Sequence, residues 1–114
     1  MDERRKEQRI LAVCKIFDQE RNFSGFVLDI NHEGVQIIVP KSFTESLEFS
    51  IIIPRMDEQN KPDLTVKIEQ RWRSSVNGEY DKIGGRLIQI DHPEEFSKYL
   101  AYFEEKLQQY DLDL

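Results

Sequence analysis

The sequence has few of the features that mark disulfide-rich, secreted or membrane-spanning proteins. Its one cysteine, Cys14, cannot form an intramolecular disulfide and is typical of a protein in the reducing cytoplasm. No apolar run approaches the roughly 20 residues that a membrane-spanning helix needs. The N-terminus also lacks the apolar segment of a signal peptide. We therefore expect a cytoplasmic protein with no membrane insertion.

Motifs of the common catalytic and cofactor-binding classes are also missing. The sequence contains no Gly-x-Ser-x-Gly motif, no phosphate-binding loop and no dinucleotide fingerprint. His32 and His92 are far apart in the sequence and have no cysteine or acidic set at metal-ligand spacing. We predict that the chain is not an enzyme, holds no metal and needs no cofactor.

Positive charge is scarce and local. The chain has 22 acidic against 16 basic residues, a net charge of −6, and residues 91–114 alone carry seven acids against two lysines. A protein that binds a tract of DNA or RNA needs a broad basic face, and the sequence indicates none. We therefore expect no DNA or RNA partner, whereas a small anion with one or two phosphates needs only a local basic cluster.

The length of 114 residues predicts one domain with a core of its own. Short runs rich in β-branched and aromatic residues alternate with polar stretches that favour turns. They predict strands at residues 10–17, 23–30, 34–39, 47–53, 64–72 and 80–90. Because no helix intervenes, we expect a mainly β fold, an antiparallel barrel or sandwich.

The strand at residues 64–72 has the clearest alternation of apolar and polar side chains. Leu64, Val66, Ile68 and Trp72 are expected on one face, which predicts that Trp72 belongs to the core. Cys14 is likewise expected in the core. The pair Gly84-Gly85 indicates a β-bulge or close packing between strands.

The chain ends in a predicted amphipathic helix. Asp91 is expected to be its N-cap, and Pro93 suits its first turn. Apolar residues recur at helical spacing at Phe96, Tyr99, Leu100, Phe103, Leu107 and Tyr110. We expect this face to pack on the barrel or on a partner.

Basic residues gather in the first nine positions, including Arg4, Arg5 and Arg9. This segment has no apolar periodicity and is expected to be a flexible charged arm. On charge pattern alone it could be a solvated arm with no further role. A guanidinium group, however, suits phosphates and the O6/N7 edge of guanine, so the arm could also fold over a bound ligand.

A polar turn, Asp29-Ile30-Asn31-His32-Glu33-Gly34, separates two predicted strands. It could be a plain turn, since Asp and Asn bond their own backbone and Gly tolerates positive φ. The carboxylate of Asp29 could instead accept hydrogen bonds from the N–H groups of guanine. The arm and this turn together could hold a guanine nucleotide from opposite sides.

The arm motif Arg5-x-x-x-Arg9, the turn motif Asp29-x-Asn31-x-x-Gly34 and the run 82–87 occur in an order that resembles the PilZ family of bacterial cyclic di-GMP receptors. The resemblance covers about residues 4–90. It implies a six-stranded antiparallel β-barrel. Together with the charged arm and the predicted helix, this divides the chain into a flexible arm at residues 1–9, a PilZ-like barrel at 10–90 and a helix at 91–114 that packs on the barrel or a partner.

The resemblance also implies a cyclic di-GMP site on the outer surface of the barrel. Arg5 and Arg9 would contact guanine Hoogsteen edges and phosphates, and Asp29 would bind the guanine N–H groups. Gly34 would let the backbone approach and turn. An arginine at the place of Arg4 tends to accompany a stacked pair of ligand molecules.

One residue departs from the family pattern. Asn31 stands where the family usually has serine, and its amide can replace the hydrogen bond of a hydroxyl, although its bulk would shift or weaken the ligand.

The function that follows is a cyclic di-GMP receptor that changes conformation by closing its arm and signals through an unidentified protein partner, in control of motility, biofilm or exopolysaccharide. Asn31 leaves open a non-binding PilZ-like scaffold, for example in pilus or flagellar assembly. The Arg5/Arg9 spacing and Asp29 favour the receptor. A barrel that binds single-stranded nucleic acid is a distant third, because the exposed positions carry as many acids as bases.

Overall fold

The structure is a computed structural model that describes residues 10–44, 46–55 and 60–112. Within these ranges, the side chains of residues 10–13, 103 and 106–112 are not described. The predicted arm, with Arg4, Arg5 and Arg9, lies outside the described residues.

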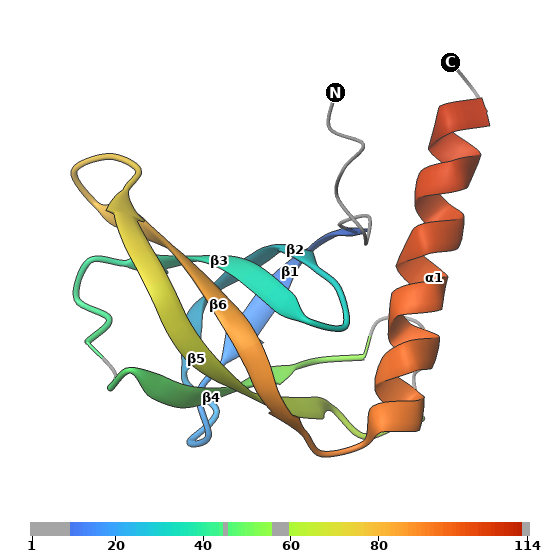
Figure 1. Cartoon of the computed structure of the whole chain (residues 1–114), viewed down its shortest axis with the longest axis horizontal. Coiled ribbons are helices and arrows are strands. Elements are labelled where there is room, and N and C mark those ends of the chain that lie inside the picture. The colour runs from blue at the N-terminus through green and yellow to red at the C-terminus, as the bar shows by residue number, and fades with distance from the viewer. Residues whose placement is uncertain (1–9, 45, 56–59, 113–114) are drawn as a thin grey trace.

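Six antiparallel strands form a closed barrel in the order β1-β2-β3-β6-β5-β4 (Figure 1). The strands are β1 Ile10–Phe17, β2 Phe23–Ile30, β3 Gly34–Pro40, β4 Glu48–Ile53, β5 Leu64–Ser75 and β6 Tyr80–Ile90. A helix, α1 Pro93–Leu112, follows the last strand. The predicted fold of six antiparallel strands and a C-terminal helix is confirmed, and β5 is three residues longer than predicted.

The core fills the barrel with side chains from alternate strand positions. In β3 and in the first half of β5, buried and partly exposed residues alternate one by one. This alternation follows from the pleat of a strand, which sends successive side chains to opposite faces of the sheet. Burying each aliphatic side chain contributes about 1.5–3 kcal/mol to folding. Cys14 is buried among these residues, as the sequence predicts.

Trp72 is a correction to the prediction from sequence. Leu64, Val66 and Ile68 are buried, but Trp72 is 43% exposed. A register shift between Gln70 and Trp72 places one extra residue in β5 opposite β6. Such a bulge inverts the alternation of side chains beyond it, so Trp72 lies on the outer face of the barrel.

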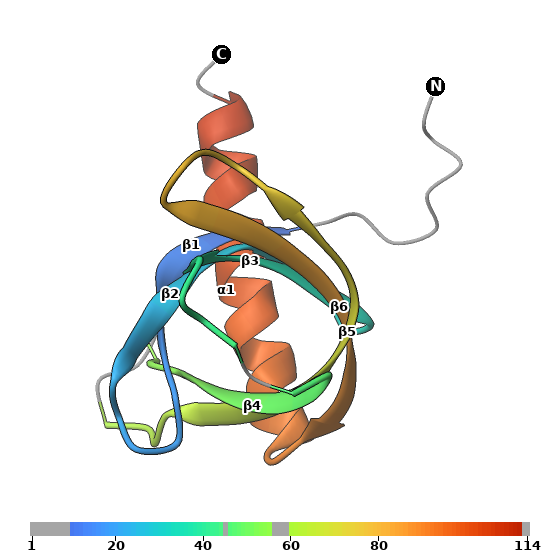
Figure 2. The same cartoon turned by 90° about the vertical axis from the view of Figure 1, so that its left-hand side faces the viewer.

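Helix α1 runs alongside the barrel and continues beyond it in both views (Figures 1 and 2). Phe96, Tyr99 and Leu100 are buried, so this part of the predicted apolar face does pack on the barrel. The hydroxyl of Tyr99 lies 3.2 Å from the sulfur of Cys14 in β1. Burial raises the pKa of the Cys14 thiol, although its bond to Tyr99 opposes the rise. The side chains of Phe103, Leu107 and Tyr110 lie outside the described ones.

The helix also covers the weakest seam of the barrel. β1 and β4 are joined by one cross-strand pair, Phe17 with Ile52. Just beyond β4, Nη1 of Arg55 lies 3.1 Å from Oε1 of Glu95 in the first turn of α1, and the Arg55 side chain is 1% exposed. The hydrogen bond from Arg55 lowers the pKa of Glu95. Contacts of α1 with Cys14 in β1 and with Arg55, two residues after β4, therefore lie on both sides of the seam.

Asp91 does not act as the N-cap that the sequence predicts. Its Oδ1 accepts a hydrogen bond of 3.1 Å from the backbone N–H of Thr65 in β5. The helix begins at Pro93, and the carbonyl of His92 accepts its first hydrogen bond, from the N–H of Phe96. Asp91 therefore fastens the start of the helix to the barrel.

Candidate ligand-binding groove

The turn between β2 and β3 is organised by Asn31. Its Oδ1 accepts hydrogen bonds from the backbone N–H groups of Glu33 and Gly34, both at 2.8 Å. The N–H of Asn31 donates to the carbonyl of Gly34 at 3.0 Å. Asn31 is buried, and its Nδ2 donates no hydrogen bond to the residues that the structure describes. The side chain thus caps the turn through its oxygen, as a serine hydroxyl can also do.

Trp72 faces this turn across the outer surface of β3 and β6. A Cβ atom added to Gly84 would lie 2.2–2.4 Å from three atoms of the Trp72 indole. The indole therefore lies against the backbone of β6, in a place that only glycine leaves open. Because Trp72 is partly exposed, part of its ring surface is available to stack on a flat ligand.

Two arginines flank Trp72 and share one carboxylate. Nη1 of Arg71 and Nε of Arg86 lie 3.1 and 3.2 Å from the same Oε1 atom of Glu69. Both arginine side chains are 59% exposed. The hydrogen bond from Arg86, followed by that from Arg71, lowers the pKa of Glu69. Glu69 therefore stays ionised and holds both guanidinium groups beside the indole.

Together these residues line one groove of about 340 Å³. Its lining residues are Asn31, Glu33, Gly34, Val35, Gln36, Arg71, Trp72, Gly84, Gly85 and Arg86. The groove combines an aromatic surface for a planar base with guanidinium groups for phosphates. The carboxylate of Glu33 and the amide of Asn31 add polar groups suited to the edge of a base.

Only some of the site residues predicted from the sequence line this groove. Asn31 and Gly34 line it together. Asp29 does not line it, and lies next to the turn in β2, paired with Leu11 and Gln36. Arg4, Arg5 and Arg9 lie outside the described residues. β1 begins immediately after the arm, and its first residues pair with the end of β2, so the register brings the point where the arm joins the barrel next to the turn.

Sequence reasoning missed much of the groove. The sequence pattern predicts Trp72 in the core and indicates no ligand-binding role for Arg71 or Glu33. The pair Gly84-Gly85 is the sequence signal that could have indicated the position of Trp72. Two adjacent glycines in a strand indicate that another group approaches the backbone closely. Arg86 belongs to the run 82–87 that contributed to the family resemblance.

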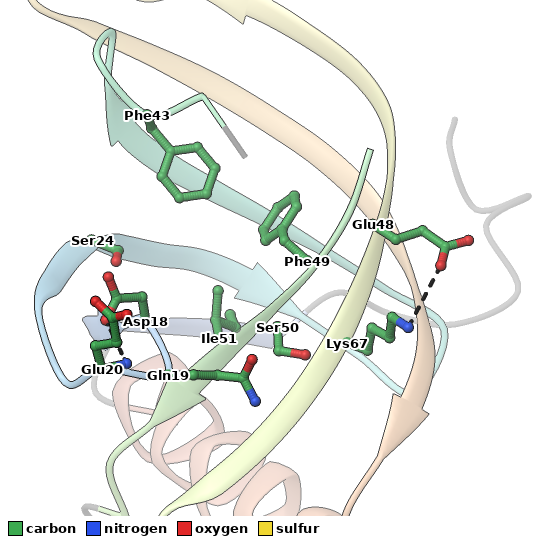
Figure 3. Close-up of a pocket in the computed structure, with 10 residues that line it drawn as sticks. All are labelled: Asp18, Gln19, Glu20, Ser24, Phe43, Glu48, Phe49, Ser50, Ile51 and Lys67. Atoms are coloured by element: carbon green, nitrogen blue, oxygen red, sulfur yellow. Dashed lines mark hydrogen bonds and ion pairs between the residues drawn. The ribbon is translucent and has the colours of Figure 1, made fainter. Parts of the chain in front are cut away.

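A second cavity, of about 420 Å³, lies elsewhere on the barrel (Figure 3). Phe43 and Phe49 meet edge to face in it, with ring centroids 5.2 Å apart. Its charged lining residues are Asp18, Glu20, Glu48 and Lys67, and Lys67 lies 3.6 Å from Glu48. Because acids outnumber bases there, this cavity does not suit an anionic ligand, whereas the groove does.

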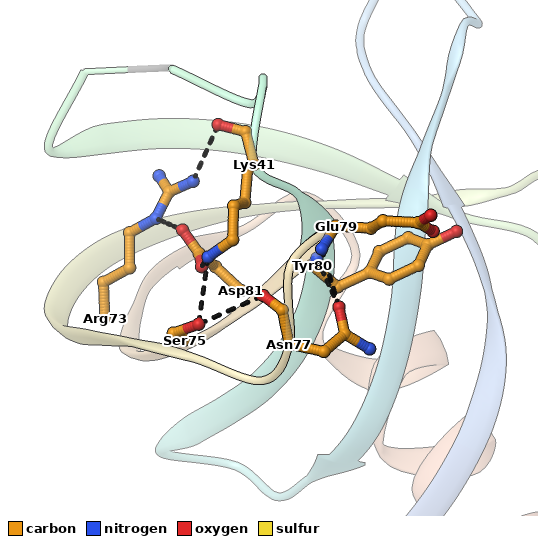
Figure 4. A network of polar contacts seen from close by, with 7 residues as sticks. All are labelled: Lys41, Arg73, Ser75, Asn77, Glu79, Tyr80 and Asp81. Atoms are coloured by element: carbon orange, nitrogen blue, oxygen red, sulfur yellow. Dashed lines mark hydrogen bonds and ion pairs between the residues drawn. The ribbon is translucent and has the colours of Figure 1, made fainter.

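A polar network lies at the hairpin end of β5 and β6, next to the groove residues Trp72 and Gly84 along these strands (Figure 4). Nζ of Lys41 lies 2.6 Å from Oδ1 of Asp81, and Nε of Arg73 lies 2.7 Å from its Oδ2. Lys41 also donates to the hydroxyl of Ser75 at 3.0 Å. These contacts tie the β5–β6 hairpin to the end of β3.

The turn that lines the groove also touches helix α1. Nε2 of His32 lies 3.2 Å from the hydroxyl oxygen of Ser97. The His32 ring also meets the buried ring of Phe96 edge to face, with centroids 5.9 Å apart. A displacement of the turn would therefore reach the helix through one side chain.

The fold is that of a small closed barrel with a C-terminal helix, and the groove lies on its outer surface. The PilZ domain matches residues 3–104, and the chain belongs to the PilZ domain family. PilZ domains generally bind cyclic di-GMP and are binding modules.

A solved structure has the same fold. The chain is similar to the Bacillus subtilis inhibitor of motility MotI/DgrA, with a TM-score of 0.69 and 14% sequence identity. The similarity covers 92% of this chain and 52% of MotI/DgrA, so the chain spans about half the length of that protein. No curated protein matches the sequence. Among the described residues, no helix is long and apolar enough to cross a membrane.

Proposed function

We propose that the chain is a cytoplasmic cyclic di-GMP receptor and that the ligand binds in the groove between the β2–β3 turn and Trp72. The observation that carries this proposal is the composition of the groove in a PilZ domain. An exposed indole, two guanidinium groups and the motif residues Asn31 and Gly34 line a single depression. These are the groups that a purine base joined to phosphates requires.

Each side of the ligand has candidate partners on the barrel. A guanine base stacks on Trp72, and the phosphates lie toward Arg71 and Arg86. The carboxylate of Glu33 accepts hydrogen bonds from the guanine N–H groups, and Nδ2 of Asn31 donates to a ligand oxygen.

The arm and Asp29 complete the proposed site. Arg5 and Arg9 contact guanine Hoogsteen edges and phosphates, and Asp29 accepts guanine N–H groups. Arg4 accompanies a second, stacked ligand molecule. The register supports this arrangement, because β1 starts beside the turn and directly follows Arg9 in the sequence.

The proposed output is a change in the surface that a protein partner reads, in control of motility, biofilm or exopolysaccharide. Bound ligand neutralises the arginines and favours the closed arm, which shifts the equilibrium only if the ligand binds the closed state more tightly. The contact of His32 with Ser97 gives the turn a route to α1.

The alternative of a non-binding scaffold in pilus or flagellar assembly depends mainly on Asn31. Since Asn31 caps the turn through its oxygen as a serine hydroxyl can, its presence does not weigh against ligand binding. We therefore favour the receptor.

Calorimetric titration with cyclic di-GMP tests the proposal. The variants Arg5→Ala, Arg9→Ala, Asp29→Ala and Arg86→Ala are compared with Arg21→Ala, an exposed arginine paired with Asp63 away from the groove. Each groove or arm variant should weaken binding about 10-fold or more, since a guanine–arginine contact is worth roughly 1–3 kcal/mol. Arg21→Ala should bind like the wild type.

Intrinsic fluorescence provides a second measurement. Trp72 is the one tryptophan of the chain, so stacking of guanine on it should quench most of the emission. Low salt should tighten binding, because phosphate contacts contribute. Absence of heat and of quenching at high ligand concentration would reject the receptor and leave the scaffold.

A further inference from the structure

Strands β1, β2, β3 and β6 present an aromatic surface outside the groove. We define the lysine–aromatic face by Lys15, Phe17, Phe23, Phe26, Ile38 and Lys82. Phe23 is 51% exposed and Phe26 36%. Their rings are 5.4 Å apart, and Phe23 also lies 6.2 Å from Phe17. A row of three phenylalanine rings, with Phe23 in contact with the other two, on the outside of a small barrel indicates a surface that another molecule covers.

The sheet register places the lysines on both sides of this apolar surface. Lys15 pairs with Phe26, Phe26 with Ile38, and Ile38 with Lys82. Directly paired residues of antiparallel strands point to the same side of the sheet. Three strand spacings separate the two lysines, or roughly 14 Å along the sheet.

These lysines differ from the others that the structure describes. Four of the six lysines with described side chains, Lys41, Lys61, Lys67 and Lys98, each lie within 4 Å of a carboxylate. Lys15 and Lys82 form no ion pair with the described residues. No acid belongs to the lysine–aromatic face, although the chain has a net charge of −6. The face is therefore locally basic on an acidic protein.

We propose that the lysine–aromatic face docks an amphipathic helix of a partner protein, with an apolar stripe flanked by acidic residues on both sides. A helix with its side chains is about 10–12 Å wide, which fits between two lysines at this separation. The apolar stripe would cover the phenylalanines, and one row of acids would meet each lysine. Lysine–carboxylate pairs across such an interface select the partner by charge.

Two other occupants fit less well. Helix α1 of a second copy is acidic, but its apolar residues Phe96, Tyr99 and Leu100 are buried against its own barrel. An anionic membrane surface would be held by only two lysines and would repel an acidic chain. A partner helix satisfies both the apolar surface and the charges.

The face also borders the candidate groove. Gln36 pairs with Gly84 in the groove, and Ile38 pairs with Lys82 two residues along the same strands. A helix docked on the face would thus lie beside a ligand in the groove. Docking itself does not depend on the nucleotide and is tested without it.

The test uses two synthetic helical peptides of about four turns with the same leucine stripe, flanked by glutamates in one and by lysines in the other. Fluorescence anisotropy measures the binding of each to the full chain. We expect the wild type to prefer the glutamate peptide at least 10-fold. The double variant Lys15→Glu/Lys82→Glu should prefer the lysine peptide, and Phe23→Ser should weaken binding of either peptide.

Leu47→Ser and Lys98→Glu serve as controls, because both residues are exposed and lie outside the face. They should bind like the wild type, and thermal unfolding checks that every variant is folded. Equal binding of the two peptides by the wild type, or an unchanged preference in the double variant, would overturn the proposal. Vesicle binding and dimerisation are measured as well, with phosphatidylglycerol vesicles and by analytical ultracentrifugation. The proposal would also be overturned if the double variant abolished either of these while its peptide preference stayed unchanged.

Discussion

Strands β5 and β6 hold a carboxylate between two basic side chains at each of two places, and the two places are built differently. In the hairpin network, Asp81 uses one oxygen for Lys41 at 2.6 Å and the other for Arg73 at 2.7 Å (Figure 4). In the groove, Glu69 uses the same oxygen for Arg71 and Arg86, at 3.1 and 3.2 Å.

The two carboxylates differ in how fully they engage their basic partners. Asp81 is 15% exposed and both of its oxygens are engaged at short distances, so these contacts contribute to folding. The arginines beside Glu69 are mostly exposed and share one acceptor atom. Guanidinium groups in that state keep N–H donors for an incoming phosphate. The same residue types therefore stabilise the hairpin at one place and, at the other, keep donors that suit the proposed ligand.

The largest effect is expected from Gly84→Ala, which places a methyl group in the volume of the Trp72 indole. Forced displacement of the ring should weaken cyclic di-GMP binding at least 10-fold and cost about 1–3 kcal/mol of stability. Gly78→Ala in the hairpin is the control, because a Cβ there meets nothing within 4 Å, and its stability should stay within about 0.5 kcal/mol of wild type. For both variants, calorimetry measures ligand binding and urea unfolding measures stability. Equal binding by Gly84→Ala and wild type would show that Trp72 is not part of the site.

The next effect compares the two carboxylates directly. Asp81→Asn should lower the urea midpoint and leave ligand binding unchanged, because it removes the charge that Lys41 and Arg73 share. Glu69→Gln keeps an oxygen for the arginines but removes a negative charge beside an anionic ligand, so binding should tighten severalfold with little change in stability. The distinction between the two places fails if both variants lose stability equally and bind alike.

The pH dependence of stability tests the contribution of Asp81 separately. The hydrogen bond from Lys41, followed by that from Arg73, lowers the pKa of Asp81 in the folded state. The unfolded chain binds that proton at a higher pH, near 4, so the stability that Asp81 contributes is complete above that pH and is lost as the pH falls further. Urea midpoints at neutral pH and below pH 4 should therefore decline less in Asp81→Asn than in wild type. An identical decline would mean that the network contributes nothing to folding.

The sequence predicted the barrel well because alternation is a local signal. Strands β1, β2 and β6 begin and end where the residue pattern indicates. Trp72 was misplaced because nothing in the neighbouring residues marks the extra residue at the β5 bulge, which depends on the register with β6. Asp91 was misplaced because a tertiary partner, Thr65, competes for its carboxylate.

The groove was only half predictable for a related reason. Its turn wall is a continuous motif, so Asn31 and Gly34 could be named from the sequence. Its other wall comes from residues 71–72 and 84–86, and only the pairing of β3, β5 and β6 brings them to the turn. Which residues face one another across a sheet depends on the register between strands, and the sequence of a single strand does not determine that register.

The smallest expected effect concerns whether the β2–β3 turn of the groove communicates with α1 while the β5–β6 turn does not. His32 contacts Ser97 and Phe96 from an exposed position, so His32→Ala should change stability by no more than about 1 kcal/mol. In the wild type, cyclic di-GMP should change the hydrogen exchange of amides in the first two turns of α1. Ser97→Ala removes the same hydrogen bond from the other side and should reduce that response as His32→Ala does. Asn77→Ala in the β5–β6 turn should leave it unchanged. A full response of α1 in both His32→Ala and Ser97→Ala would mean that the turn reaches the helix by another route, whereas loss of the response with ligand affinity retained would identify His32 as the link between site and helix.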